Sequence, residues 1–192
     1  AKNFRNSKVL DTKILSFTFL QFFLVVISFL CLVFSFVVSD FSNETVFNNS
    51  HTTKPIFYKI AGTWGNHEGS LLLWLLVLTL FILIFLIRTK NQSVKYRVLT
   101  LVFQQIIIVG FFIFLIKTSN PFNHIYPIPT EGLGLNPILQ DPALAIHPPI
   151  LYLGYVGSSI IFSSVLAATT LNIISKKWAS HIKKWVLISW IF

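Results

Sequence analysis

His147 is the residue whose neighbours suggest chemistry most clearly, since it stands directly before Pro148 and Pro149. A residue that precedes proline favours extended backbone, whereas proline itself fits the first turn of a helix. We therefore expect His147 to stand rigidly at the mouth of an apolar helix. Histidine is an axial ligand of haem iron, and the amides of a helix start favour anions such as haem propionates. The pattern predicts either a haem-binding histidine or a rigid helix start with an incidental histidine.

A second group of suggestive residues precedes another apolar run, in the segment from Gly62 to Ser70. Trp64 suits the aromatic belt at a membrane interface. Glu68 suits the first turn of a helix, where a carboxylate complements the helix dipole, and His67 lies between them. Taken alone, this segment is typical of an elaborate helix start. The competing interpretation is a functional surface that includes His67.

The apolar runs themselves contain no Asp, Glu, Lys, Arg or His. Such residues usually mark ion pathways within membranes, so their absence argues against a pump. We expect Gln104 and Gln105, polar residues in the third run, to hydrogen-bond to a neighbouring helix. Cys31 is the single cysteine, which excludes a CxxCH haem-attachment site and a disulfide framework. No residue of this sequence is identified as catalytic.

These residues must be positioned by helices in a membrane. The 192 residues are 54% hydrophobic and only 11% charged, with a mean hydropathy of +0.74, whereas soluble domains carry about 25% charge. A helix needs about 20 apolar residues to cross a bilayer. The sequence predicts an all-α integral membrane domain over residues 1–192, with outward loops at 40–69 and 117–149. We expect spans at 14–39, 70–87, 98–116 and 150–171, and the start of a fifth at 185–192.

The net charge of +9 is distributed unevenly between the two sides of the predicted membrane domain. Most of the 15 basic residues lie before span one, between spans two and three, and after span four. The positive-inside rule then puts the N-terminus in the cytoplasm or the mitochondrial matrix. The charge is thus a topology signal, and no nucleic-acid partner is expected. The inward basic residues are Lys2, Arg5, Lys8, Lys13, Arg88, Lys90, Lys95, Arg97, Lys176, Lys177, Lys183 and Lys184.

Four sequence elements together resemble the CcmF-type cytochrome c maturation family. Residues 64–74 read WGNHEGSLLLW and are similar to the family's WGxHEGSLLLW signature. Residues 119–122 (SNPF), 135–142 (LNPILQDP) and 147–157 (HPPILYLGYVG) are similar to further family elements, in the same order. The resemblance covers roughly residues 60–192, and Asn66 stands where the family often has Gly.

The resemblance implies part of a haem lyase, which accepts haem from a CcmE-like carrier and joins it to the CxxCH thiols of apocytochrome c. It implies that His147 is an axial ligand of the haem iron, with b-type haem in transit and not necessarily retained. The family's tryptophan-rich WWD loop would lie beyond Phe192, on a partner chain or on a missing continuation, so the chain alone is not expected to be catalytic. The residues expected to support this outward surface are Trp64, His67, Glu68, Asn136, Asp141, Pro148, Pro149 and Tyr152.

Two alternatives stay open at the level of the sequence. The chain is either the N-terminal portion of a haem lyase or a non-catalytic structural subunit of a respiratory or assembly complex. Its membrane is expected to be the mitochondrial inner membrane, as for split mitochondrial family members, with the bacterial inner membrane as the alternative. The expected partners are the chain with the WWD loop, the haem carrier, apocytochrome c and membrane lipid.

Overall fold

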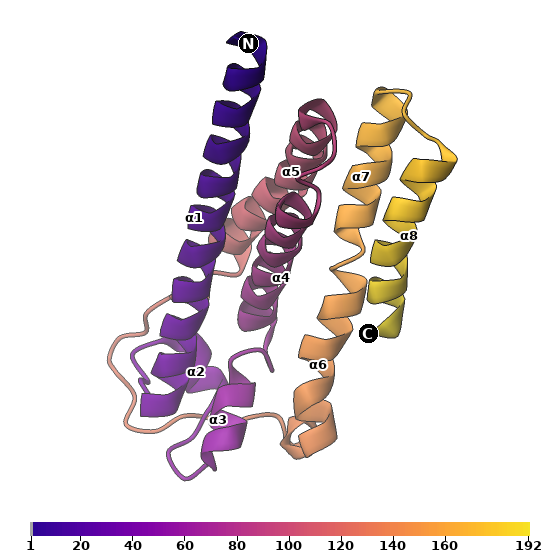
Figure 1. Cartoon of the computed structure of the whole chain (residues 1–192). Coiled ribbons are helices and arrows are strands. Elements are labelled where there is room, and N and C mark those ends of the chain that lie inside the picture. Colours follow the sequence, from indigo (N-terminus) through magenta and orange to yellow (C-terminus); the bar gives the residue numbers. More distant parts are fainter. Residues whose placement is uncertain (1) are drawn as a thin grey trace. The chain divides into compact units, whose positions relative to one another are not determined.

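The computed structural model describes the backbone of residues 2–192 and the side chains of residues 9–192, so the side chains of Lys2, Arg5 and Lys8 lie outside the described residues. Within residues 2–192 the chain consists of helices and loops, with one isolated β-bridge between Asn43 and His124 (Figure 1). The elements are α1 (Lys2–Val38), α2 (Glu44–Asn49), α3 (Ile56–Gly62), α4 (His67–Arg88), α5 (Val94–Thr118), the 3-10 helix η1 (Pro137–Gln140), α6 (Pro142–Tyr155), α7 (Ser159–Thr170) and α8 (Lys176–Ile191).

Four stretches of these helices are long and apolar enough to cross a membrane: Val9–Val38, His67–Arg88, Val94–Thr118 and Pro142–Thr170. The 22 residues of α4 would extend about 33 Å at the rise of an α-helix. Helices suit apolar sequence in lipid because they satisfy every backbone polar group within the segment. The prediction of an all-α membrane fold with four long apolar helices is confirmed, and the chain is a multi-pass membrane protein.

The helices begin before the predicted apolar spans do, and the early starts of α6 and α8 have a clear local cause. The fourth apolar segment becomes helical at Pro142, eight residues before Ile150. The last helix, α8, begins at Lys176 after the N-cap Ser175, whose side chain accepts from the N–H of Trp178, and so starts well before Trp185. In both places a capping side chain defines the helix start, whereas hydropathy registers only where the apolar residues begin.

The chain divides into two compact units, and unit 1 comprises residues up to Leu24, Val77–Gly110 and Tyr152–Phe192. In unit 1 the predicted bonds from the third apolar run to neighbouring helices are confirmed. Gln104 donates to the Ser159 hydroxyl (2.9 Å) and accepts from that of Ser163 (2.8 Å). The side chains of Gln105 and Gln21 bond to each other reciprocally at 2.6 and 3.0 Å. Gln104 is fully buried, and these bonds satisfy its amide in apolar surroundings.

The predicted fourth span is interrupted between α6 and α7, within unit 1. The Gly157 N–H bonds to the carbonyl of Tyr152, five residues back (3.3 Å), as in a π-bulge. A Cβ on Gly157 would lie 2.2 Å from the Leu153 carbonyl oxygen and 2.5 Å from the Phe81 ring. Glycine is therefore required here so that the ring can pack against the interruption. In the same unit α7 and α8 run side by side (Figure 1).

Unit 2 comprises Val25–Leu76 and Phe111–Leu151, and it holds nearly all the residues singled out by the sequence. Here α2 and α3 fold out of the segment predicted as an outward loop. The chain after α5 pairs with the start of α2, since the Glu44 N–H donates to the Asn123 carbonyl (2.9 Å) and that of Ile125 to the Ser42 carbonyl (3.0 Å). Unit 2 is thus the structured frame for the candidate site.

Candidate functional site

The helix that carries His147 begins with a well-formed N-cap. Asp141 Oδ1 accepts from the N–H of Leu144 (3.0 Å), and the Asp141 carbonyl accepts from the N–H of Ala145 (2.9 Å). Pro142 occupies the first helical position, where its missing N–H costs nothing. Asp141 therefore caps the start of α6, and its Oδ1 bonds to the backbone of that helix.

Pro148 and Pro149 lie inside α6. A proline in a helix interior cannot donate to the carbonyl four residues earlier, so Pro149 leaves the carbonyl of Ala145 without its usual partner. Trp64 supplies the replacement, because its indole Nε1–H donates to the Ala145 oxygen at 2.8 Å. Ala145 is 2% exposed, where an unsatisfied carbonyl would be costly. This bond explains how the helix accommodates Pro149.

The expectation that His147 precedes the helix in extended geometry is therefore wrong. His147 lies six positions into the 14-residue α6 helix. The preference of a pre-proline residue for extended backbone is a local bias. Here the Asp141 cap on one side and the Trp64 bond on the other favour helix over that bias.

Three further contacts fix the position of Trp64 and of the turn that follows it. Its ring stacks on Phe29, with centroids 6.5 Å apart and planes 13° apart. The carbonyl of Trp64 accepts from the hydroxyl of Ser70 (2.7 Å). The turn that follows packs on the segment before α6, since a Cβ on Gly65 would lie within 3.2 Å of the side chains of Leu135 and Leu139. Trp64 therefore joins the start of α4 to α6 within unit 2.

The residues between Trp64 and α4 form a tight cap. Asn66 Oδ1 accepts from the N–H of Gly69 (2.7 Å), while its amide donates to the Gly62 carbonyl (2.6 Å). A Cβ on Gly69 would lie 1.6 Å from the carbonyl oxygen of Thr63. Asn66, the departure from the family pattern, is thus the N-cap of α4, and Gly69 permits the close approach of two backbone segments.

His147 has an exposed side chain, and its ring makes no hydrogen bond to any residue between 9 and 192. Leu144, Ile150 and Leu151, three and four positions away, share its helix face. Each of them is 43 or 44% exposed. The imidazole therefore stands free on an apolar helix face, which is the chemistry that an axial ligand of a largely apolar porphyrin requires.

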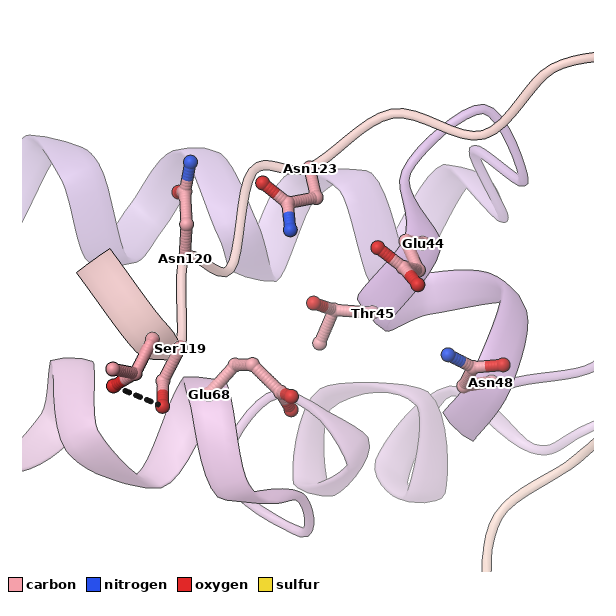
Figure 2. A pocket seen from close by; sticks show the side chains of 8 residues that line it. Glu44, Thr45, Asn48, Glu68, Ser119, Asn120 and Asn123 are labelled. Carbon is pink, nitrogen blue, oxygen red and sulfur yellow. Dashed lines mark hydrogen bonds between the residues drawn. The ribbon is translucent and has the colours of Figure 1, made fainter. Parts of the chain in front are cut away.

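The remaining predicted residues make their described contacts with groups other than His147. His67 is exposed, and its ring meets Phe114 edge-on with centroids 6.4 Å apart. Glu68 instead lines a polar pocket with α2 and the end of α5 (Figure 2). Asn136 caps η1 by accepting from the N–H of Ile138 (3.0 Å). Tyr152 belongs to unit 1, whereas the other residues of this group belong to unit 2.

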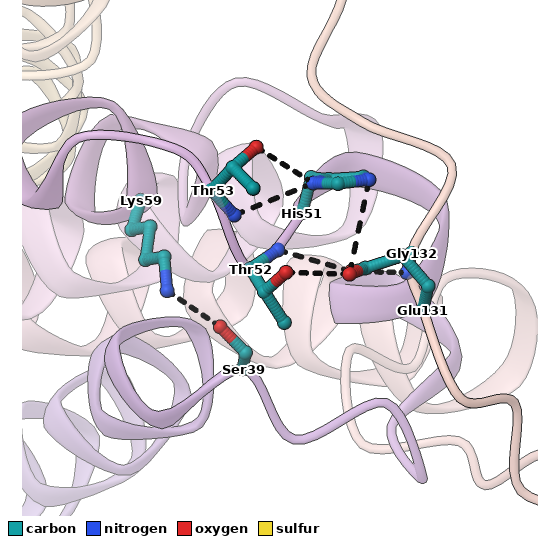
Figure 3. Close-up of polar contacts among 7 residues, drawn as sticks. All are labelled: Ser39, His51, Thr52, Thr53, Lys59, Glu131 and Gly132. Atoms are coloured by element: carbon teal, nitrogen blue, oxygen red, sulfur yellow. Dashed lines mark hydrogen bonds and ion pairs between the residues drawn. The ribbon is translucent and has the colours of Figure 1, made fainter.

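Sequence reasoning missed a second polar network on the outward segments of unit 2, shown in Figure 3. Glu131 accepts from the hydroxyl of Thr52 (2.5 Å) and from the Thr52 N–H (3.0 Å). The Nε2 atom of His51 lies 3.8 Å from Oε2 of Glu131. The bond from the Thr52 hydroxyl is the main cause that lowers the pKa of Glu131 from 4.5 to about 2. The ionised Glu131 thus fastens the long segment after α5 to the chain before α3. No sequence motif marks this pairing.

The comparisons with known proteins match this arrangement. The sequence model of the family described as Cytochrome C assembly protein matches residues 64–192. The chain is 48% identical to cytochrome c-type biogenesis protein CycK of Rhizobium meliloti over 89% of its length and 25% of that protein. It is 41% identical to CcmF of Escherichia coli over 92% of its length and 27% of that protein.

A solved structure is also similar. The structure titled Cytochrome c Heme Lyase CcmF matches 92% of this chain and 27% of its own, with a TM-score of 0.77 and 29% sequence identity. The chain spans about a quarter of the length of the curated relatives it matches. The resemblance found in the sequence motifs is confirmed: this chain is CcmF-like and belongs to the cytochrome c assembly protein family.

Proposed function

We propose that the chain is the N-terminal portion of a cytochrome c haem lyase and that His147 is an axial ligand of the haem iron. The observation that carries this proposal is the free imidazole of His147 on an exposed apolar face of α6. Haem is the substrate here, held on its way to the CxxCH thiols of apocytochrome c. The names of the relatives, cytochrome c biogenesis proteins and a haem lyase, support the same reading.

The residues around His147 fit such a ligand. An imidazole nitrogen must keep a lone pair for iron, and no described protein group competes for it. Exposed Leu144 and Leu151 offer apolar surface for a porphyrin edge, one on each side of His147 along α6. Trp64 is a positioning residue in this proposal, because its bond to Ala145 fixes the turn of α6 directly before His147.

The chain is proposed to act together with other proteins. The WWD loop and the second axial histidine would come from a chain that carries the C-terminal CcmF part, so that catalysis is a property of the assembly. A CcmE-like carrier would deliver haem, and apocytochrome c would receive it. The membrane is proposed to be an inner membrane, bacterial or mitochondrial, with His147 facing away from the side that holds the basic residues.

Replacement of His147 tests the proposal. His147→Ala, introduced into the native complex, is expected to abolish haem retention and reduce c-type cytochrome levels at least tenfold. His124→Ala is the matched control, since His124 is an exposed histidine of the same unit that lies outside α6. Haem staining of total cytochromes and the optical spectrum of the purified complex are the measurements. Normal cytochrome levels in His147→Ala, with only respiratory subunits co-purifying, would favour a structural subunit instead.

A further inference from the structure

A groove of about 330 Å³ lies between α1 and α4 within unit 1. Its lining is mainly apolar and consists of Leu15, Ser16 and Phe19 of α1 and Leu83 and Ile87 of α4. Phe19 and Ile87 are 57% and 46% exposed, so the groove is open along the outside of the two helices. Both helices are candidate membrane spans, and the groove therefore belongs to the membrane-facing surface of the chain.

A buried arginine from a third helix holds the two walls of this groove. Arg97 of α5 is 2% exposed. Its guanidinium forms an ion pair with Asp11 of α1 and donates to the carbonyl of Leu86 in α4 (2.7 Å). Asp11 lies one helical turn before Leu15, and Leu86 directly precedes Ile87. Arg97 therefore fixes α1 against α4 at the end of the groove that approaches the basic side of the chain.

The same ion pair leaves this end of the groove positively charged. Lys13 lies on α1 directly before the lining residues of that helix, and Arg88 is the last residue of α4. Both side chains are exposed, and neither forms an ion pair or a hydrogen bond with any residue between 9 and 192. Asp11 is the only acidic residue in the sequence of unit 1, and Arg97 already engages it. The two cations therefore have no carboxylate to neutralise them within the unit.

One hydroxyl lies in the groove beside these cations. Ser16 is three positions after Lys13, so the two residues share a face of α1. A hydroxyl in a helix commonly bonds to the carbonyl four residues earlier, as those of Thr89 and Thr100 do in this unit. The Ser16 hydroxyl makes no hydrogen bond to the described part of the chain. The groove thus offers a free donor between its charged end and its apolar lining.

We infer that this groove is a binding site for an anionic phospholipid of the leaflet on the basic side of the membrane. An acyl chain suits the apolar lining, the Ser16 hydroxyl suits an ester oxygen, and Lys13 and Arg88 suit the phosphate. Basic sites between transmembrane helices on the cytoplasmic or matrix side bind anionic headgroups in this way. A neutral lipid would fill the apolar part equally well, so the two unpaired cations select the headgroup.

Lipid binding to the purified full chain tests the inference. The protein in detergent is mixed with equal amounts of phosphatidylglycerol and phosphatidylcholine that carry the same acyl chains, and native mass spectrometry counts the lipids bound. Each basic residue near the headgroup is expected to favour the anionic lipid about fivefold. We therefore expect at least a tenfold preference for phosphatidylglycerol at one site.

The Lys13→Gln/Arg88→Gln variant should lose this preference, because it removes both cations at the groove. Lys176→Gln/Lys177→Gln is the matched control. It removes two exposed basic residues of the same unit, at the start of α8, and should keep the preference of the parent. Because both variants lose the same charge, a difference between them reports the groove itself and not the overall charge of this side.

Ser16→Phe is a further variant that fills the groove and leaves the charge unchanged, and it should weaken binding of phosphatidylglycerol at least tenfold. Circular dichroism and size-exclusion chromatography check that each variant folds as the parent does. Equal binding of the two lipids to the parent would overturn the inference. An unchanged preference in a folded Lys13→Gln/Arg88→Gln variant, or unchanged binding in folded Ser16→Phe, would overturn it too. None of these results bears on His147, whose test uses haem.

Discussion

The bond from Trp64 to Ala145 connects the motif at residues 64–74 to α6, the helix that carries His147. Each segment is recognisable in the sequence, but Trp64 and Ala145 are 81 positions apart, and local patterns do not reveal their contact. The missing N–H of Pro149 was the available signal, since a proline inside a helix leaves a known carbonyl free. Because extended backbone was predicted at His147, Pro149 was not placed inside a helix, and the free carbonyl of Ala145 was not predicted.

Trp64→Phe is expected to destabilise the protein by about 1–3 kcal/mol, because the buried Ala145 carbonyl loses its donor. Pro149→Ala in the same chain restores a backbone N–H that can bond to Ala145. The double variant should therefore be more stable than Trp64→Phe alone. Thermal unfolding in detergent measures both, with Trp190→Phe as the control at an 83% exposed tryptophan. Additive effects of the two substitutions would contradict this account of the helix.

The Glu131 carboxylate gives the outward segment a defined pH dependence. Its pKa is lowered from 4.5 to about 2 mainly by the bond from Thr52, so the folded state favours the ionised form. The stabilisation is present above about pH 4.5 and is lost as the pH falls towards 2. Melting temperatures of the parent should fall further over this interval than those of Glu131→Gln. If the melting temperatures of the parent and of Glu131→Gln fall equally between pH 4.5 and 2, the bond from Thr52 to Glu131 does not stabilise the folded state.

At the scale of elements, capping residues and glycines decide where the helices begin and break. The four long apolar helices could be predicted from hydropathy, because apolar length is a local property. The start of α6 at Pro142 could not, since hydropathy does not weigh the Asp141 cap or the indole that satisfies Ala145. The interruption at Gly157 depends on the Phe81 ring, which is also distant in the sequence.

Gly69→Ala is the sharpest test of the turn that starts α4. The added Cβ would lie 1.6 Å from the Thr63 carbonyl oxygen, so backbone must move. We expect a loss of about 1–3 kcal/mol or more in the free energy of unfolding. Gly110→Ala is the matched control, because a Cβ there meets nothing within 4 Å and alanine is the better helix former. In thermal unfolding, Gly69→Ala should lower the stability of the protein and Gly110→Ala should raise it. Equal destabilisation by both variants would contradict the close approach of Gly69 to the Thr63 carbonyl.

At the scale of the whole molecule, the sequence predicted the membrane class and the family, and the comparisons confirm both. It could do so because hydropathy and long motifs are carried by neighbouring residues. The polar pocket around Glu44 and Glu68 was not predicted, because its walls come from three separate segments of the chain, at residues 44–48, 68 and 118–123. Glu68, which the motif assigned to the outward surface, lines that pocket in the fold.

The orientation in the membrane is open to direct test. In a Cys31→Ser background, single cysteines replace Asn91 and Thr130, which are both exposed loop residues. The positive-inside rule predicts that a membrane-impermeant thiol reagent labels the Thr130→Cys variant from the outward side of sealed vesicles. The Asn91→Cys variant should react only after the vesicles are opened. The reverse pattern would invert the proposed topology and place His147 on the wrong side for its partners.

The central claim, that His147 binds haem iron, is tested most directly by the optical spectrum of the native complex. The His147→Gly variant leaves space for a free ligand, so added imidazole can replace the missing side chain. We predict that His147→Gly loses the Soret absorption of the bound haem and that imidazole restores it, with no change in the parent. An unchanged Soret band in His147→Gly without imidazole would show that another residue holds the iron.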